Sequence, residues 1–233
     1  MSGDKLILGI PSKGRLMEQT VDYFAGLNLR FLKNGHERGY RGEVAGFPDV
    51  EVAYLSASEI ARHLQLGRIH LGITGEDLVR EHIPDVERRC EFIARLGFGR
   101  ADVVVAVPEC WLDVETVVDL EDAASFFRRE HRRHLRGATK YMNLARRFFA
   151  EKGLLSYRLV ESLGATEGTP AAQTAEFIVD ITTTGTTLQA NNLKVLRDGI
   201  ILRSEACLIS SRAAQRSPSM QDAEAKFRQM LAG

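Results

Sequence analysis

The chain has 233 residues, 44% of them hydrophobic and 27% charged, which is enough for a buried core in one large domain or two small lobes. Thirty-one basic residues balance thirty-one acidic ones, so the basic excess of a dedicated nucleic-acid-binding protein is missing. No segment approaches the roughly 20 consecutive apolar residues of a membrane helix, and the first apolar run closes at Pro11, too early for a signal peptide.

The cysteines are three in number, Cys90, Cys110 and Cys207, and lie far apart in the chain. An odd, scattered set favours reduced thiols over a disulfide framework. Structural zinc is not expected either, since the sequence has no Cys-x-x-Cys pair. We therefore expect a cytoplasmic protein with neither nucleic acid nor membrane as a partner.

The first part of the chain predicts alternating strands and helices. Buried strands are expected at 6–10, 50–55 and 70–74, each followed by turn residues and a helical pattern. Such repeated strand–turn–helix units are typical of a parallel sheet. The second of these helices should be capped by Ser56 or Ser58. The segment 30–46, rich in glycine and basic residues, predicts a hairpin or a mobile loop.

The pattern starts afresh near residues 97–99. Strands are expected at 102–108, 157–160 and 177–181, and a helix is expected to follow a Thr139 cap. Two short apolar runs, 200–203 and 206–209, predict a pair of strands. A last helix should begin at Ser217-Pro218, with serine as the cap and proline in the first turn.

The segment from Phe177 to Leu188 is the most informative one. A strand with Asp180 near its end leads into a loop of hydroxyl residues and one glycine: Thr182, Thr183, Thr184, Gly185, Thr186 and Thr187. Active sites of α/β proteins lie at such strand ends, and glycine, free amides and hydroxyl groups suit a phosphate. Asp180 could accept hydrogen bonds from sugar hydroxyls. The alternative is a plain threonine-rich turn; a P-loop is excluded, because no Gly-Lys-Ser/Thr triplet is present.

This loop resembles the phosphate loop of phosphoribosyltransferases. The spacing of eight residues further resembles the signature of ATP phosphoribosyltransferase, the first enzyme of histidine biosynthesis: Glu167, Ala175, Ile178, Asp180, Thr184, Gly185, Thr187 and Leu188. Other stretches agree with that family, namely 12–15, 71–77, 96–99, 138–141 and 190–191. Two positions depart from it, because the family commonly has glycine where Gln173 stands and aspartate where Glu176 stands.

The resemblance implies a fold and a division of the chain. The expected fold is α/β and two-lobed, like the type II periplasmic binding proteins, with a mostly parallel sheet in each lobe and a cleft between the lobes. Lobe I is expected to take residues 1–96 and 180–213, and lobe II residues 97–179. Residues 214–233 would form a C-terminal helix with no regulatory domain after it. The chain thus resembles the short form of the family.

The resemblance also implies the reaction and its partners. N1 of ATP would attack the anomeric carbon of phosphoribosyl pyrophosphate, and pyrophosphate would leave. Mg²⁺ would be the cofactor, held mainly by substrate phosphates, so no metal cluster of protein side chains is expected. Short forms work with a regulatory subunit that resembles histidyl-tRNA synthetase. That implies a hetero-oligomer, with a homodimer as its building block.

The site residues follow from the charge of the substrates. A highly charged leaving group needs cations, and Arg15, together with Ser12, Lys13 and Gly14, is predicted to bind pyrophosphate or the ATP phosphates. Arg38 is predicted as a second clamp; Arg41 is its rival, and a solvated hairpin is the alternative for both. Glu167 and Asp180 are expected near the ribose. The predicted catalytic set is Arg15, Arg38, Asp180 and Glu167.

Two other functions stay open at this point. One is another phosphoribosyl pyrophosphate-dependent purine or pyrimidine phosphoribosyltransferase, and the other is a non-catalytic two-lobed protein that binds a small molecule. The basic run 128–136 contains His131 and His134 at helical spacing, but both stand among arginines, which does not favour metal. It predicts a solvated face or a subunit contact, with Phe126 and Phe127 on the buried side of the helix.

Overall fold

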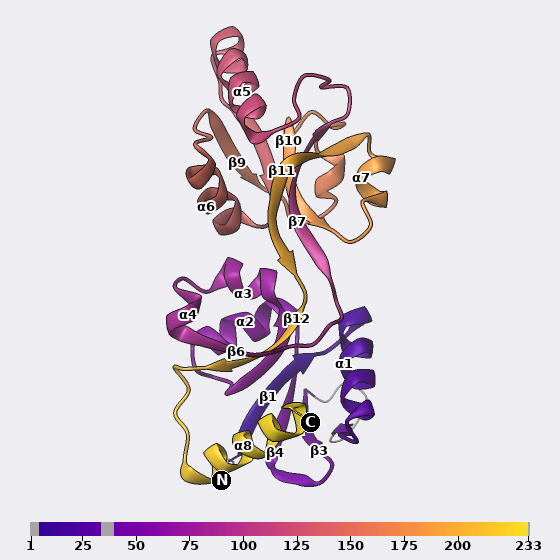
Figure 1. Cartoon of the computed structure of the whole chain (residues 1–233), viewed down its shortest axis with the longest axis vertical. Helices are drawn as coiled ribbons and strands as arrows, with labels where there is room; N and C mark the ends of the chain where they lie inside the picture. Colours follow the sequence, from indigo (N-terminus) through magenta and orange to yellow (C-terminus); the bar gives the residue numbers. More distant parts are fainter. Residues whose placement is uncertain (1–4, 34–39, 233) are drawn as a thin grey trace. The chain divides into compact units, whose positions relative to one another are not determined.

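A computed structural model describes residues 5–33 and 40–232 of the chain. The chain forms two compact units (Figure 1): the first contains the residues up to Gly99 and those from Glu205 onward, and the second runs from Arg100 to Ser204. Each unit has its own β-sheet with helices packed against it. The predicted α/β fold in two lobes is therefore confirmed.

In the first unit, the described residues form a sheet in the order β2-β3-β4-β1-β5-β12-β6. The central strands β4, β1 and β5 are parallel, and the strands outside them are antiparallel to their neighbours. The strands are β1 (Leu6–Pro11), β2 (Phe31–Lys33), β3 (Arg41–Val44), β4 (Phe47–Leu55), β5 (Leu71–Gly75), β6 (Cys90–Arg95) and β12 (Ala206–Ser211).

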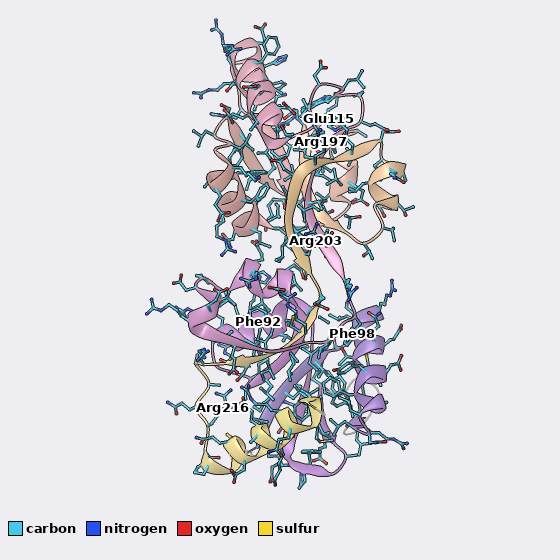
Figure 2. The ribbon with its side chains drawn as sticks, in the orientation of Figure 1. Phe92, Phe98, Glu115, Arg197, Arg203 and Arg216 are labelled. Atoms are coloured by element: carbon cyan, nitrogen blue, oxygen red, sulfur yellow. The ribbon has the colours of Figure 1, made fainter. Side chains whose placement is uncertain are left out.

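Helices cover both faces of this sheet. Phe24 of α1 and Phe227 of α8 stack at 5.6 Å in the core on one face, and Phe98 lies 5.6 Å from Tyr23 at the side of that core (Figure 2). Ile60 and Val79 belong to the core on the other face. The helices are α1 (Gly14–Gly26), α2 (Ala57–Gln65), α3 (Glu76–His82), α4 (Val86–Arg89) and α8 (Pro218–Ala232).

The start of α2 shows how the sequence fixes a helix boundary. The hydroxyl of Ser56 accepts a hydrogen bond from the Glu59 amide at 3.3 Å, and the Glu59 carboxylate accepts one from the Ser56 amide at 2.8 Å. These bonds satisfy two donors that the first turn leaves free, and they lower the pKa of Glu59. Of the two predicted caps, Ser56 is therefore the one used.

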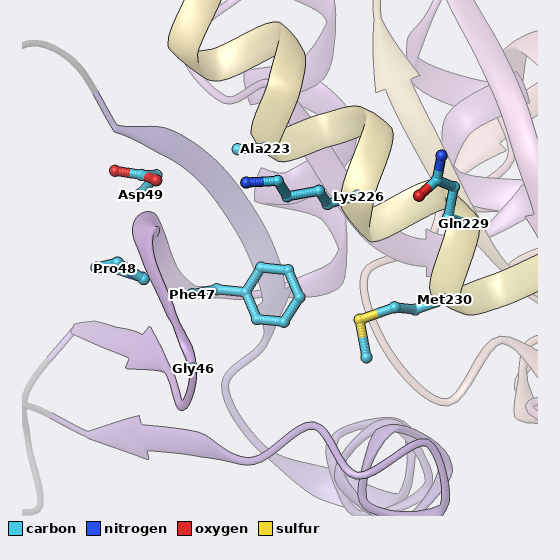
Figure 3. Close-up of a pocket in the computed structure, with 8 residues that line it drawn as sticks. All are labelled: Gly46, Phe47, Pro48, Asp49, Ala223, Lys226, Gln229 and Met230. Carbon is cyan, nitrogen blue, oxygen red and sulfur yellow. The ribbon is translucent and has the colours of Figure 1, made fainter.

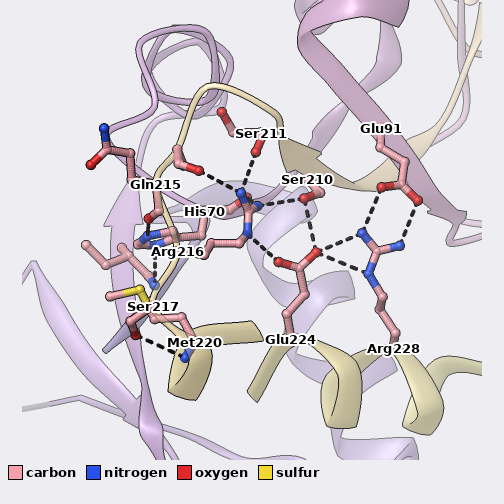
Figure 4. Close-up of polar contacts among 12 residues, drawn as sticks. His70, Glu91, Ser210, Ser211, Gln215, Arg216, Ser217, Met220, Glu224 and Arg228 are labelled. Atoms are coloured by element: carbon pink, nitrogen blue, oxygen red, sulfur yellow. Dashed lines mark hydrogen bonds and ion pairs between the residues drawn. The ribbon is translucent and has the colours of Figure 1, made fainter. Parts of the chain in front are cut away.

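A polar network joins α8 and the segment before it to the sheet (Figure 4). Arg228 binds Glu91 of β6 through two hydrogen bonds of 2.8 and 2.9 Å, and Arg216 binds Glu224 at 2.6 Å. Burial opposes ionisation of Glu224, but the bonds from Arg228 and Arg216 outweigh it and lower its pKa. Because each buried charge has a partner, the network can hold α8 without an uncompensated desolvation cost.

The second unit contains a sheet in the order β11-β7-β10-β8-β9, as far as the chain is described. Strands β10, β8 and β9 are parallel, whereas β7 is antiparallel to both of its neighbours. The strands are β7 (Ala101–Pro108), β8 (Leu135–Thr139), β9 (Tyr157–Glu161), β10 (Phe177–Thr182) and β11 (Leu193–Ser204). The helices are α5 (Val117–His131), α6 (Met142–Lys152), η1 (Thr166–Gly168) and α7 (Thr186–Ala190).

Three sequence-based expectations about the strands are wrong. The sheets are mixed rather than mostly parallel, because a buried apolar run such as Val103–Val107 suits either direction. Runs 200–203 and 206–209 do not pair with each other, because the first lies in β11, which pairs with β7, and the second lies in β12, which pairs with β5 and β6. Finally, residues 180–204 belong to the second unit, since β10 and β11 both pair with β7.

The basic run 128–136 is split between two elements. It covers the end of α5 and the start of β8, and Arg132 between them has a φ of 52°. Phe127 contacts His131 at 4.3 Å between ring centroids. Phe126 is 58% exposed, so its predicted burial is wrong. Elsewhere in this unit, Glu115 before α5 and Arg197 of β11 form an ion pair of 3.1 Å (Figure 2).

Two further observations concern the residues that the structure describes. The three cysteines are free thiols. None of the described helices combines the length and the apolar character needed to cross a bilayer.

Candidate functional site

The candidate site of the second unit lies at the carboxyl edge of its three parallel strands. Val179 of β10 pairs with Thr139 of β8, and Thr139 in turn pairs with Glu161 of β9. Because the register is parallel, the residues that follow these three strands emerge at one edge of the sheet. They are the threonine loop after β10, with Asp180 near the end of that strand, Lys140 after β8, and the segment with Glu167 after β9.

The loop Thr182–Thr187 is a tight turn between β10 and α7. Gly185 has a φ of +77°, in the left-handed region that glycine adopts without a steric cost. Its amide donates a hydrogen bond of 2.9 Å to the Thr182 hydroxyl, which closes the turn. The hydroxyls of Thr184 and Thr186 lie 2.8 Å apart on the exposed side.

For binding an anion, the loop provides exposed hydroxyl groups rather than a strong helix N-terminus. Thr183, Thr184, Thr186 and Thr187 are exposed, and Thr183 donates to the carbonyl of Arg100 at 3.3 Å. Helix α7 has only five residues, so its dipole is short and adds little to anion binding. The part of the sequence-based argument that invoked a helix start is therefore weakened, whereas the cluster of hydroxyls remains.

Asp180 is a partly buried charge at this edge, with 13% of its side chain exposed. Its Oδ1 accepts a hydrogen bond of 2.8 Å from the Ile181 amide. Burial raises the pKa of Asp180; the Ile181 amide and the Lys140 charge act against this, and the neighbouring Glu167 adds to it. An ionised carboxylate can accept several hydrogen bonds through its two oxygens, so Asp180 can accept further bonds from a ligand.

Glu167 reaches the same edge from η1. This short helix is held by Thr166, whose buried hydroxyl donates to Ser162 at 3.0 Å. The Glu167 side chain is half-buried and close enough to raise the pKa of Asp180. The structure therefore places Glu167, Asp180 and the threonine loop at one edge of the sheet, and their predicted role at a ribose phosphate stays a prediction.

Lys140 is a residue of this edge that the sequence analysis did not assign to the site. Its Nζ lies 3.9 Å from Oδ1 of Asp180, although the two residues are forty positions apart in the chain. In the sequence, residues 138–141 stand out only as a stretch that agrees with the family signature. Strand β8 was not predicted. Without it, the pairing of β8 with β10, which brings Lys140 beside Asp180, could not be inferred.

The predicted site residues of the first unit lie where β1 passes into α1. Ser12 donates its amide to the Leu55 carbonyl at 2.8 Å, and Lys13 occupies the N-cap position of α1 with no side-chain cap bond. Gly14 has a φ of +76°. Lys13, Gly14 and Arg15 are exposed, so the amides and side chains of this helix start can reach a ligand.

The two predicted arginine clamps of the 30–46 segment have different outcomes. Arg38 falls outside the described residues. Arg41 lies on β3 and forms an ion pair with Glu51 of β4. Of the hairpin or mobile loop expected for this segment, the structure describes two antiparallel strands, β2 and β3, which pair with each other.

A cavity of the first unit contains none of the predicted site residues. It measures about 450 Å³ and lies between the β3–β4 turn and α8 (Figure 3). Its lining consists of Gly46, Phe47, Pro48, Asp49, Ala223, Lys226, Gln229 and Met230. Within the described parts of the chain, no group of three His, Cys, Asp or Glu side chains could hold a metal ion.

Comparison with known proteins assigns the family. The model of the HisG family, described as ATP phosphoribosyltransferase, matches residues 56–232. This chain belongs to the ATP phosphoribosyltransferase family. The matched range includes the threonine loop, Asp180, Glu167 and Lys140, so the edge described above lies within the part of the chain that the family model covers.

Curated members of the ATP phosphoribosyltransferase family are close in sequence. The protein of Bradyrhizobium diazoefficiens is 57% identical over 216 residues, which cover 93% of this chain and 66% of that protein. The protein of Mesorhizobium japonicum is 58% identical over 211 residues and is covered to 91%. This chain therefore spans just under two thirds of the length of some relatives and nearly all of another.

Solved structures agree with the fold expected for the ATP phosphoribosyltransferase family. A chain of the ATP phosphoribosyl transferase (HisG:HisZ) complex from Thermotoga maritima gives a TM-score of 0.72 at 23% identity, covering 97% of this chain and 96% of that one. The truncated, arginine-bound ArgBP of T. maritima gives 0.52 at 12% identity, covering 99% and 96%. The likeness to periplasmic binding proteins is confirmed for the fold.

Proposed function

We propose that this chain is an ATP phosphoribosyltransferase, which transfers the phosphoribosyl group of phosphoribosyl pyrophosphate to N1 of ATP and releases pyrophosphate. This is the first step of histidine biosynthesis. The observation that carries the proposal is the closed threonine loop beside Asp180 in a chain of this family. A phosphate loop with an adjacent acceptor for hydroxyl groups suits a sugar phosphate.

The second unit would bind the phosphoribosyl part of the substrate. The exposed hydroxyls of the loop and its backbone amides would donate hydrogen bonds to the 5-phosphate. Asp180 and Glu167 would accept hydrogen bonds from the ribose hydroxyls, which are donors that a carboxylate binds well. The donors and acceptors are thus divided between the loop and the two carboxylates.

The first unit would bind the triphosphate or the leaving pyrophosphate. Lys13 and Arg15 are exposed cations at the start of α1, a thirteen-residue helix whose first amides lack a side-chain cap. Such a helix start favours anions. Arg15 would stabilise the negative charge that develops on the leaving group. Arg38 is proposed as a second cation for these phosphates, from the sequence alone.

The reaction is a substitution at the anomeric carbon. The lone pair of adenine N1 forms the new C–N bond, and the C–O bond to pyrophosphate breaks with its electron pair on the leaving oxygen. The proton that the product loses comes from the adenine N6 amino group. Binding both substrates in a reactive orientation would supply much of the rate, so no covalent enzyme intermediate is required.

A divalent cation, Mg²⁺, would take part as a companion of the phosphates. Magnesium is commonly bound through substrate phosphates and water rather than by a dedicated cage of protein side chains. When bound, the ion would neutralise charge on the pyrophosphate. No residue of this chain is assigned to it as a ligand.

The assembly and compartment are also part of the proposal. The T. maritima neighbour was solved as a HisG:HisZ complex, and a comparable hetero-oligomer, with a histidyl-tRNA-synthetase-like regulatory subunit and a homodimer as building block, is proposed here. The free thiols agree with a reducing cytoplasm.

The test is a product assay on the purified chain. ATP, phosphoribosyl pyrophosphate and magnesium are incubated with it, and phosphoribosyl-ATP and pyrophosphate are followed by chromatography with mass detection. The assay is repeated with the regulatory subunit, with histidine, and with free purine and pyrimidine bases in place of ATP. Turnover of a free base but not of ATP would replace the proposal with another phosphoribosyltransferase. Binding without any turnover, even with the regulatory subunit, would favour a binding protein.

A further inference from the structure

The site of the second unit poses an electrostatic problem. The site contains two carboxylates, and the charge of Glu167 raises the pKa of Asp180. The threonine loop beside them is proposed to bind an anion. Like charges repel, and the repulsion is stronger where water is partly excluded. A sugar phosphate would therefore bind poorly unless a cation at the same edge offsets the carboxylates.

Lys140 has the position that such a cation needs. It follows Thr139, the residue of β8 that pairs with Val179, so it stands next to Asp180 across the sheet. Its Nζ lies 3.9 Å from Oδ1 of Asp180 and 5.2 Å from the ring centroid of the buried Tyr141. The cation–π contact and the ion pair together restrict where the ammonium group lies.

The ammonium group also keeps donors for a ligand. A distance of 3.9 Å exceeds the 2.7–3.2 Å of a protein hydrogen bond, so the contact with Asp180 is an ion pair only. The Lys140 side chain is 46% exposed. The three N–H donors of an ammonium group can thus turn to an oxygen of a bound phosphate or sugar.

We infer that Lys140 is a positioning residue of this site: its ammonium group offsets Asp180 and Glu167 beside the threonine loop, so that one ligand can present hydroxyls to the carboxylates and a phosphate to the loop. The inference rests on the proposed function and sharpens it. It limits the ligand class to sugar monophosphates and their pyrophosphorylated derivatives, in which both groups occur in one molecule.

Among the other described elements around Asp180, namely β7, α7 and η1, the residues that face it supply no positive charge to offset the carboxylates. On β7, Val104 stands opposite Asp180, and the nearest titratable residue, Asp102, is opposite Thr182; Asp102 itself pairs in register with Arg203 of β11. Helix α7 carries no charged residue. On η1 the charge facing Asp180 is that of Glu167, which is negative.

The chain offers a closely matched control pair. Lys152 lies 3.3 Å from Asp198, is 40% exposed, and stands 5.7 Å from the ring centroid of Phe148. Oδ1 of Asp198 accepts a backbone amide, as Oδ1 of Asp180 does. This second lysine–aspartate pair of the same unit involves none of the site residues, so Lys152→Met removes an equivalent charge away from the loop.

The first measurement is binding of ribose 5-phosphate by titration calorimetry to the full chain. Lys140→Met should weaken binding about tenfold or more, as expected for loss of a charge-assisted contact; Lys140→Arg should restore most of it, and Lys152→Met should bind like wild type. Equal affinities of wild type and Lys140→Met would overturn the inference.

The second measurement needs neither ligand nor turnover. The carboxyl carbon of Asp180 is titrated by NMR in the ligand-free chain, with Asp180→Asn to assign the signal. Lys140→Met should raise the pKa of Asp180, whereas Lys152→Met should leave it unchanged. An unchanged value in Lys140→Met would overturn the inference even if the wild-type chain makes phosphoribosyl-ATP. A wild-type chain that makes no product would instead remove the proposed function, and the titration would still decide the role of Lys140.

Discussion

The ring of Phe177 occupies the space that Gly137 leaves open on the neighbouring strand. The two residues pair in register between β10 and β8, and a Cβ on Gly137 would lie 2.3 Å from the edge of the ring. Phe177 is fully buried and also packs against Phe149 at 5.8 Å between ring centroids. Since β10 leads into the threonine loop and β8 into Lys140, this contact lies between the two strands that carry these parts of the site.

Gly137→Ala should therefore destabilise the chain by about 1–3 kcal/mol, because a buried ring cannot yield without disturbing its other contacts. It should also weaken binding of ribose 5-phosphate, since β10 must shift against β8. Urea unfolding followed by circular dichroism measures the first effect and calorimetry the second. Gly164→Ala is the matched control, as a Cβ there meets no atom within 4 Å. Equal stability of the two variants would contradict the packing argument.

Glu176 should give the second unit an acid-dependent stability. Burial opposes its ionisation, but hydrogen bonds from Arg136 and Arg133 outweigh this and lower its pKa to about 2. The folded pKa is thus depressed, so the unfolded chain binds more protons between about pH 4.5 and 2. The stabilisation is fully present above about pH 4.5 and is lost as the pH falls through about 2.

Glu176→Gln should accordingly lose up to about 3 kcal/mol at pH 6, the free energy that corresponds to such a shift. Its stability should also fall less steeply than that of wild type between pH 4.5 and 3. Urea unfolding at a series of pH values measures both effects. Glu161→Gln, at the exposed end of β9, serves as the control. Parallel pH profiles for wild type and Glu176→Gln would refute the assignment.

The sequence was sufficient to predict the elements with strong local signals. The loop 182–187 follows a strand that is apolar except for Asp180, and α2 is preceded by Ser56, one of the two predicted caps. Residues 217–218 likewise mark the start of α8. In each case the local chemistry determines the backbone, so neither the pairing of strands nor the packing of helices was needed.

Features that depend on pairing could not be predicted. Strand β8 is five residues long and contains Arg136 and Gly137, so neither its composition nor its length marks it as a central strand. Its place is fixed by Phe177, which needs a glycine opposite. Without β8, the nearness of Lys140 to Asp180 had no visible signal. Strand direction was hidden for a related reason, because strands buried on both faces show no alternation.

One departure from the family pattern has a backbone explanation. Gln173, where the family commonly has glycine, has a φ of 56°. It lies in the turn before β10, with its amide bonded to the Pro170 carbonyl at 3.0 Å, and its carbonyl accepts from Arg136 at 2.8 Å. The turn thus keeps the conformation that glycine adopts readily, at the steric cost of a side chain in the left-handed region.

Gly185 should tolerate asparagine better than alanine. A Cβ at this position meets no atom within 4 Å, but the φ of +77° is strained for most side chains. Gly185→Ala should cost about 1–2 kcal/mol and weaken binding of ribose 5-phosphate by moving the amide that closes the turn onto Thr182. Asparagine adopts this conformation more easily, so Gly185→Asn should lose less of both. Thermal melts and calorimetry compare the two, and identical losses would exclude the conformational cause.

Arg15 should affect turnover more than substrate binding. Its exposed guanidinium at the start of α1 is proposed to stabilise the charge that develops on pyrophosphate. Arg15→Ala should therefore lower kcat about 100-fold, as for loss of one donor to a developing negative charge, with a smaller change in KM for ATP. Steady-state kinetics with coupled detection of pyrophosphate measures both constants.

The control for Arg15 is Arg68→Ala. Arg68 is an exposed arginine of the same unit, but it precedes β5, at the opposite edge of the sheet from the β1–α1 turn, because β1 and β5 are parallel. If simple loss of one positive charge from the first unit slowed the reaction, both variants would lose kcat equally. A loss confined to Arg15→Ala would instead tie the effect to the helix start. A rise in KM at unchanged kcat would limit Arg15 to binding and leave the stabilisation of pyrophosphate to another residue.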